Sequence, residues 1–474
     1  MPNQSIADKI AEADAERQRI ANNIEVAYNV ARSKGATMPQ AQNSANLAAT
    51  INSISGGQQV NKEDKDVNFF DYDGTVLYTY TAEKFYALTE LPSLPQHDGL
   101  VANGWTYALA EIIDYLNDGQ TVDVGIYYET DNGNTRLHLL VENNDDLPPE
   151  LPLYVKIRNG TLDISVNGVQ SVSETESANS ETNHTILVSL PTPTSFPAKY
   201  TIDISFTGDG YYTIGQNSVS TAIFGDIPLR IGLLESAEIG NRCRITANSF
   251  YNYFNMKSIV LPSSITKLEN YTFYGCSSLN SVVIPEPLTD LGEQTFRNCV
   301  ALKRVVLSKS ITSIKYCDFY NCVSLRWIII PENVNTCGSY VFYYCTSLKK
   351  IKLSGITSMG TMLFSNCFSL ESVASDGCTT LNANIFADCV SLREIKLSGT
   401  QTINAYAFSG GLKLFYFDLT AYTDSSSIPT LAASNALQNT PNTQVIYVSS
   451  QAMLEAFSNA TNWSTYASRF EVKP

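Results

Sequence analysis

The apolar residues in the second half of the chain recur at a fixed interval. Between residues 243 and 419, phenylalanines follow one another at spacings of 23, 23, 23, 23, 22, 22 and 22 residues: Phe250, Phe273, Phe296, Phe319, Phe342, Phe364, Phe386 and Phe408. From the second coil to the seventh, a cysteine stands three residues after each phenylalanine and a leucine three residues further on. One coil of this length cannot bury its apolar side alone, so the pattern predicts a β-solenoid of eight stacked coils.

The cysteines follow the same register. Six of the ten occupy one column, namely Cys276, Cys299, Cys322, Cys345, Cys367 and Cys389, and no C-x-x-C pair occurs. Cysteine at a repeated core position behaves as a small buried hydrophobe. We therefore expect a reduced, buried ladder rather than disulfides or a zinc site.

The outward face of the coils is the candidate binding surface. Side chains alternate along a strand, so residues eight and ten positions after each phenylalanine should point away from the core. Trp327, with Arg304 and Lys350 in the neighbouring coils, is the best candidate for a contact hot spot; the alternative is an ordinary exposed sheet face. The complete candidate set is Arg304, Trp327, Ile329, Lys350, Lys352, Lys396 and Tyr416.

The first 57 residues predict helices. Residues 5–33 lack Pro and Gly, and Ile or Ala recurs there at alternating steps of four and three residues from Ile6 to Ala31, with Arg17 as a polar interruption. This heptad pattern is typical of a coiled coil and could pack a trimer. A helical hairpin with a turn at residues 35–39 is the alternative, and both interpretations remain open.

Residues 58–146 predict a small α+β domain with a helix over residues 107–116. Its DYDGT segment, Asp71 to Thr75, matches the nucleophile motif of haloacid-dehalogenase-type phosphatases, in which two carboxylates and magnesium act together. The alternative is a hairpin with a type I′ turn at Asp73-Gly74 between two aromatic strands. We favour the hairpin, so we expect no catalytic residue and no enzyme; Asn132-Gly133 signals a second hairpin.

The remaining segments complete a multidomain arrangement. Residues 147–228 carry short alternating strands separated by turn residues, which indicates a β-sandwich of immunoglobulin or PKD-like type. Residues 229–420 hold the repeats. Residues 421–474, with a strand near 444–448 and a helix near 450–459, should cap the last coil.

Composition narrows the function. The net charge of −15 repels phosphate backbones, which argues against a nucleic-acid partner. The N-terminus has no apolar run typical of a signal peptide, and no stretch of eighteen apolar residues predicts membrane insertion. Only three histidines occur, His97, His138 and His184, so we expect neither a metal site nor a cofactor.

The repeat motif, as in TFYGCSSLNSVVIP, resembles the BspA-type leucine-rich repeats of bacterial surface proteins and gut bacteriophages. The segments around YTAEKFYALTELPSLP and GLVANGWTYALAEI resemble a domain of phage tail proteins that precedes such repeats. The resemblance implies a right-handed solenoid used for adhesion.

Our leading hypothesis is a phage tail-fibre or other virion-surface protein that attaches to a bacterial receptor, protein or glycan, through its repeats. The N-terminal helices would bind other virion proteins and form a homotrimer, and release by lysis would need no signal peptide. The alternative is a bacterial cell-surface adhesin.

Overall fold

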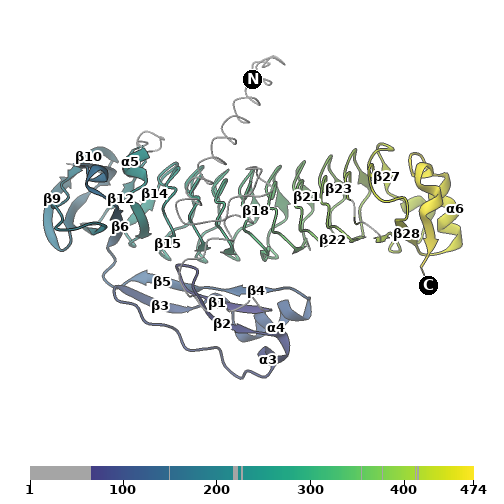
Figure 1. Cartoon of the computed structure of the whole chain (residues 1–474), viewed down its shortest axis with the longest axis horizontal. Helices are drawn as coiled ribbons and strands as arrows, with labels where there is room; N and C mark the ends of the chain where they lie inside the picture. The colour runs from purple at the N-terminus through teal and green to yellow at the C-terminus, as the bar shows by residue number, and fades with distance from the viewer. Residues whose placement is uncertain are drawn as a thin grey trace, which may run out of the picture. The chain divides into compact units, whose positions relative to one another are not determined.

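The computed structural model describes residues 66–473, apart from short gaps at 149, 217–221, 226–227, 354, 376, 412 and 414–415. The predicted N-terminal helices, residues 1–57, lie outside these described residues. What is described is rich in β-strands, with few helices, and belongs to one compact unit, Asp64–Pro474 (Figure 1).

Residues 66–131, which we call the α+β domain, form two small sheets and two helices. Strand β1 lies between β2, which is antiparallel to it, and β4, which is parallel. Strands β3 and β5 pair separately, antiparallel to each other. The elements are β1 (Val67–Phe70), β2 (Val76–Tyr80), α3 (Ala82–Tyr86), β3 (Leu100–Trp105), α4 (Leu109–Asn117), β4 (Val122–Val124) and β5 (Ile126–Thr130).

The predicted hairpin at Asp73-Gly74 is confirmed, but its turn type differs from the expected one. A type I′ turn needs two residues with positive φ, and within the loop 71–75 only Gly74 has one, at 85°. The Gly74 amide donates to the Asp71 carbonyl at 2.9 Å. The loop is therefore a β-turn that ends on a left-handed glycine.

Two sheets follow, and their apolar side chains share one core. One has the order β10-β7-β12-β14 and the other β15-β13-β6-β11-β8-β9. The strands are β6 (Thr135–Val141), β7 (Leu151–Arg158), β8 (Gly160–Val166), β9 (Val169–Glu176), β10 (Thr182–Val188), β11 (Ala198–Thr207), β12 (Tyr211–Ile214), β13 (Leu234–Glu238) and β14 (Cys243–Ile245), with η1 (Asn144–Asp146) and α5 (Pro228–Ile231) between them.

Strand β6 departs from the sequence prediction. We assigned its residues to the α+β domain, as one arm of a hairpin around Asn132-Gly133. Instead β6 pairs with β11 and β13, while β5 pairs with β3, so the second hairpin is wrong. The alternating apolar residues of β6 find their partners in the larger core, which buries Leu137, Leu139 and Val141 completely or almost completely.

The sandwich continues directly into the coils. Strand β13 is antiparallel to β6 on one side and parallel to the first coil strand, β15 (Ser258–Val260), on the other. A single hydrophobic core extends from Leu137 to Phe470. The sandwich therefore covers the first coil, whose sheet edge would otherwise stay open.

Seven of the eight coils contribute a short strand to the outward face, the first being β15. After β15 come β16 (Ser281–Val283), β17 (Arg304–Val306), β20 (Lys350–Lys352), β22 (Ser372–Ser375), β24 (Glu394–Leu397) and β26 (Tyr416–Asp418). The ladder has two interruptions: β15 and β16 lie in different sheets, and in the fourth coil the expected strand around Ile328 is not formed. Two-residue strands line another side: β18 (Ser313–Ile314), β19 (Thr336–Cys337), β21 (Ser358–Met359), β23 (Thr380–Leu381), β25 (Thr402–Ile403) and β27 (Thr430–Leu431).

The repeat phenylalanines form a continuous stack inside the coils. Consecutive rings from Phe250 to Phe408 have centroids 5.2–5.6 Å apart and lie within 20° of parallel. All eight are at most 1% exposed. Truncation of such a buried ring to alanine costs about 3–5 kcal/mol, so the stack is a principal source of stability.

The predicted cysteine ladder is confirmed. All ten cysteines are free and buried. Each ladder thiol donates a hydrogen bond, at 3.1–3.2 Å, to the carbonyl of the phenylalanine in the preceding coil. Burial raises the pKa of these thiols, which keeps them protonated and unreactive.

The predicted C-terminal strand and helix are confirmed as β28 (Val445–Val448) and α6 (Gln451–Asn459). The cap does more than cover the last coil, because β28 and β29 (Phe470–Val472) continue its sheet as two further parallel strands. The short helices η3 (Ser425–Ser427) and η4 (Trp463–Arg469) complete the cap, and Trp463 is buried with its indole N–H donated to the Pro429 carbonyl at 2.7 Å.

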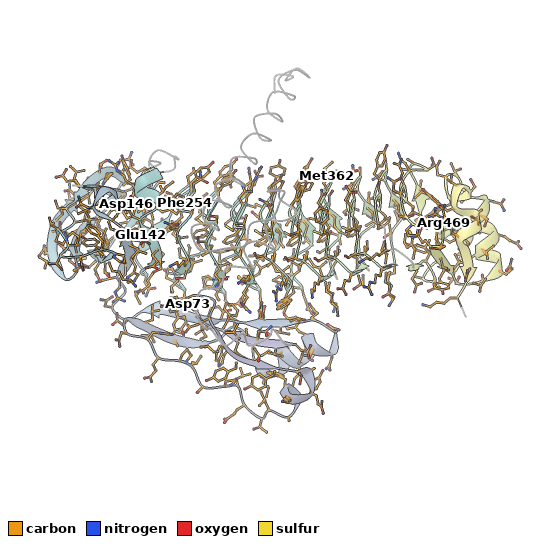
Figure 2. The ribbon with its side chains drawn as sticks, in the orientation of Figure 1. Asp73, Glu142, Asp146, Phe254, Met362 and Arg469 are labelled. Atoms are coloured by element: carbon orange, nitrogen blue, oxygen red, sulfur yellow. The ribbon has the colours of Figure 1, made fainter. Side chains whose placement is uncertain are left out.

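Two positions in each coil have left-handed backbone. They lie two residues before and two residues after the phenylalanine. The second column is mostly Asn or Gly, which adopt this conformation at low cost. The first column includes residues that do so less readily, among them Met362, with φ of 53°. Met362 lies on the edge of the coils away from the α+β domain (Figure 2).

We expect Met362→Asn to raise the free energy of unfolding by about 0.5–1 kcal/mol, because asparagine tolerates positive φ better than methionine. Denaturant unfolding followed by circular dichroism measures the change. Met362→Ala is the matched control, since alanine removes the side chain without relieving the backbone. Equal stability of the two variants would show that the backbone is not the cause.

The buried carboxyl group of Asp318 should make the stability of the fold depend on pH. Its carboxylate is fully buried and accepts hydrogen bonds from the amides of Lys315 (2.7 Å) and Thr295 (3.2 Å). Burial nevertheless raises its pKa to about 7. The folded chain then keeps a proton that the unfolded chain loses near pH 4, so stability falls from about pH 4 to 7. In pH-dependent unfolding, the stability of the wild type relative to Asp318→Asn should decline over this window; a constant difference would contradict the assignment.

Candidate binding face of the repeats

The outward sheet face has two halves with different chemistry. Ten residues after the phenylalanine, the first four coils carry Val260, Val283, Val306 and Ile329, and the last four carry Lys352, Ala374, Lys396 and Asp418. The α+β domain packs on the apolar half. Val306 and Ile329 share a core with Phe70 and Val124, and Val260 shares another with Leu100 and Tyr128.

Polar contacts surround this apolar interface. Asn280 Nδ2 donates to the Asp73 carbonyl at 3.2 Å, at the place where Figure 2 shows Asp73 between the domain and the coils. Arg304 and Asp123 approach to 3.7 Å with their side chains only 7% and 4% exposed. Further hydrogen bonds join Ser281 to the Tyr72 carbonyl, Tyr127 to Glu286, Lys309 to Glu111 and Ser263 to Glu129. The domain is thus held by both apolar and charged contacts.

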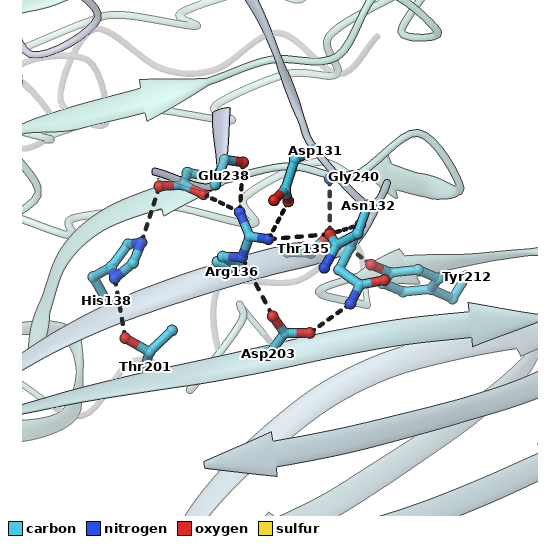
Figure 3. A network of polar contacts seen from close by, with 12 residues as sticks. Asp131, Asn132, Thr135, Arg136, His138, Thr201, Asp203, Tyr212, Glu238 and Gly240 are labelled. Carbon is cyan, nitrogen blue, oxygen red and sulfur yellow. Dashed lines mark hydrogen bonds and ion pairs between the residues drawn. The ribbon is translucent and has the colours of Figure 1, made fainter. Parts of the chain in front are cut away.

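Arg136 connects three parts of the unit (Figure 3). Its guanidinium bonds Asp131 and the Gly99 carbonyl of the α+β domain at 2.6 and 2.7 Å. It also reaches Asp203 on β11 at 3.3 Å and Glu238 on β13 at 3.2 Å. With its side chain 13% exposed, this arginine ties the α+β domain to the sandwich and to the start of the coils.

The phosphatase-like DYDGT loop is engaged in structural contacts. The Asp71 carboxylate accepts from the Tyr128 hydroxyl at 2.8 Å and lies 2.7 Å from His97 Nε2. Burial and this hydrogen bond raise the pKa of Tyr128, so the hydroxyl remains a donor. The Asp73 carboxylate accepts from the Thr75 amide within the turn. These contacts account for both carboxylates without catalysis; the absence of enzymatic activity stays a prediction.

The polar half of the face borders a groove of about 930 Å³. Trp327, Lys350, Lys352 and Lys396 line it from the coils, and residues 118–121 line it from the α+β domain. Lys352 pairs with Asp118 at 2.5 Å, and Lys396 pairs with Glu394 at 3.0 Å. In the described part of the chain, the exposed Lys349 and Lys350 have no acidic partner, and the buried indole N–H of Trp327 has no acceptor.

Of the seven predicted binding residues, the structure brings four together, buries two and leaves the side chain of one undescribed. Trp327, Lys350, Lys352 and Lys396 line one groove. The expectation that Arg304 and Ile329 face a partner is wrong for this structure, because the α+β domain buries both, leaving each 6% exposed. Tyr416 lies on β26, but its side chain lies outside the described residues.

Sequence reasoning missed that the α+β domain supplies one wall of the groove. The sequence did contain a signal: four successive coils carry an apolar residue at the same outward position, from Val260 to Ile329. An exposed apolar row of this kind is normally covered by another part of the protein or by a partner. Which segment covers it could not be read from the pattern.

No metal or membrane element was found among the described residues. In that part of the chain, no group of three or more His, Cys, Asp or Glu side chains is placed to hold a metal ion. None of the described helices has the length and apolar character needed to cross a bilayer.

The repeats match a known family model. Residues 243–371 and 312–444 match the BspA type leucine-rich repeat region, in six copies. These residues therefore carry BspA-type leucine-rich repeats. A search of curated proteins found no match.

Several solved structures are similar to the chain. A leucine-rich repeat protein of T. pallidum is 23% identical, with 40% of this chain and 86% of that chain covered and a TM-score of 0.30. A leucine-rich cell surface protein of Faecalibacterium prausnitzii is 21% identical over 53% and 94% of the two chains, with a TM-score of 0.25. The pneumococcal vaccine antigen PcpA is 16% identical over 51% and 79%, with a TM-score of 0.26.

We expect Val306→Asp to release the α+β domain from the coils, because it places a charge in the apolar interface at a cost of about 2–4 kcal/mol. Hydrogen exchange of residues 66–131 should then increase. Ala374→Asp is the matched control, since it adds the same charge in the same column where the face is open. Equal protection of the domain in both variants would contradict the docking.

Proposed function

We propose that this chain is an adhesin-type binding protein that holds a partner at a cell surface through the polar half of its repeat face. The BspA-type repeats support a display scaffold, and the groove supports a defined contact site on it. Because the α+β domain covers the apolar half, the accessible binding surface consists of coils five to eight together with Trp327 of the fourth coil.

The observation that carries the proposal is the pair of lysines beside Trp327 that have no acidic partner among the described residues. In a chain of net charge −15, Lys349 and Lys350 stand together without acidic partners among the described residues. Trp327 adds apolar area and a donor without an acceptor. A partner that presents carboxylates next to an apolar group would pair with both lysines and cover the accessible part of the Trp327 ring.

The surface-adhesin alternative now ranks above the phage-tail hypothesis. The family match concerns the repeats alone and lends no support to a phage origin. Trimerisation and attachment through residues 1–57 stay predictions. Immunodetection of the chain on the surface of the cells that encode it would support the adhesin, whereas detection only in purified virions would restore the phage tail.

We expect Trp327→Ala to weaken binding of the purified, labelled chain to its target cells by tenfold or more, as for an interface hot spot worth about 2 kcal/mol. Lys350→Ala should weaken it less and reduce its sensitivity to salt. Flow cytometry on panels of bacterial and epithelial cells measures both effects.

Phe254→Ala is the matched control for Trp327→Ala. Phe254 is an exposed aromatic residue on the edge of the coils away from the α+β domain (Figure 2). Its loss should leave attachment unchanged. If Trp327→Ala binds as well as the wild type, or if both aromatic variants lose binding equally, the groove is not the contact site.

A further inference from the structure

We propose that the C-terminal cap contains a second binding site, specific for a carboxylated saccharide and separate from the groove on the repeat face. The site is a hollow of about 790 Å³ formed by the loop 434–442 and the end of η4. Its polar lining includes Asn435, Gln438, Asn442 and Arg469. Figure 2 shows Arg469 in the cap, at the opposite end of the coils from the sandwich.

Arg469 supplies the positive charge. Its guanidinium is held by neutral acceptors: Nη1 donates to Thr440 Oγ1 at 2.9 Å and to Gln444 Oε1 at 3.0 Å, and Nη2 donates to Asn442 Oδ1 at 3.0 Å. The ring of Tyr466 lies 5.0 Å from its Cζ atom. No carboxylate of the described residues forms an ion pair with it. A fixed, half-buried guanidinium without a counter-ion is suited to bind a carboxylate.

The amides beside Arg469 have unused hydrogen-bonding capacity. Asn435 Oδ1, in the lining of the hollow, is a buried acceptor without a donor. A sugar hydroxyl donates and accepts at once, so a polyhydroxylated ligand can donate to Asn435 and also pair with neighbouring amides. Exposed Gln438 and Asn442 add amide groups to the rim. The positive charge of Arg469 thus favours a carboxylate on the ligand, and the amide side chains favour the hydroxyl groups of a saccharide.

The rigidity of the loop favours a formed site. The Tyr466 hydroxyl donates to the Ser434 carbonyl and accepts from the Leu437 amide at 3.2 Å. Thr440 Oγ1 donates to the Leu437 carbonyl at 2.8 Å. These bonds tie the loop to η4, so a ligand need not order it on binding.

Calorimetric titration of the full chain with trigalacturonic acid tests the proposal, with galactotriose as the neutral counterpart and acetate as the simple anion. We expect trigalacturonic acid to bind at least tenfold more tightly than either. Equal affinity for the neutral sugar would overturn the role of the carboxylate. Equal affinity for acetate would overturn the saccharide, and no binding of the acidic sugar would overturn the site.

Two variants place the binding in this hollow. Arg469→Gln should weaken it tenfold or more by removing the charge, but it also disturbs the loop. Gln438→Glu leaves the buried contacts intact and should weaken binding similarly by repulsion, with an unchanged melting temperature. Gln451→Glu, which adds the same charge on α6 outside the hollow, and Trp327→Ala should bind normally. Retained binding in both Arg469→Gln and Gln438→Glu would refute the location.

Discussion

The stacking of one coil on the next is the constraint on which the rest of this structure depends. A single coil has an apolar side and no second layer of its own, so its phenylalanine is buried only between the rings of its neighbours. The ladder cysteine reinforces the same contact, since it satisfies the carbonyl of the preceding phenylalanine from within the core. Both features act between adjacent coils, so the two ends of the stack need other cover.

The two ends meet that need in different ways. At the first coil, β13 joins the coil strand β15 to β6 of the sandwich, which brings an antiparallel sheet against the stack. At the last coil, β28 and β29 extend the parallel sheet, and Trp463 fills the space beneath them. The loops that complete this second end create a polar hollow around Arg469, whereas Arg136 in the sandwich is paired with Asp131, Asp203 and Glu238.

The outward sheet face is divided by one change along a single column of the repeat. Valine and isoleucine in the first four coils pack against the α+β domain, whereas the last four coils carry lysine, alanine and aspartate, of which Lys352 forms an ion pair with Asp118 of the domain. The domain extends past Trp327, where the strand ladder is interrupted, and its Asp118 reaches Lys352 of the fifth coil. The α+β domain therefore leaves the polar half of the face accessible, and residues of both the domain and the coils line the groove.

Local sequence patterns were sufficient to predict the coils, the ladder cysteines, the first hairpin and the elements of the cap. The coils and the ladder cysteines depend on neighbours at a constant sequence distance, such as Cys299 and Phe273, so a repeated pattern specifies them. The first hairpin and the cap elements followed instead from local signals, the Asp73-Gly74 turn and a single strand and helix. Strand β6 was misassigned because its partners, β11 and β13, are distant in sequence and its alternation is equally compatible with a hairpin.

For the candidate binding residues, too, the sequence predicted one property and the tertiary structure decided another. The sequence alone determined that Arg304, Trp327, Ile329 and Lys350 occupy outward positions, because strand alternation decides the direction of a side chain. Only the tertiary structure decided which of them stay accessible, since Arg304 and Ile329 are covered by a domain about 200 residues earlier in the chain. Burial by a distant segment leaves no mark at a fixed spacing, and so no periodicity could have revealed it.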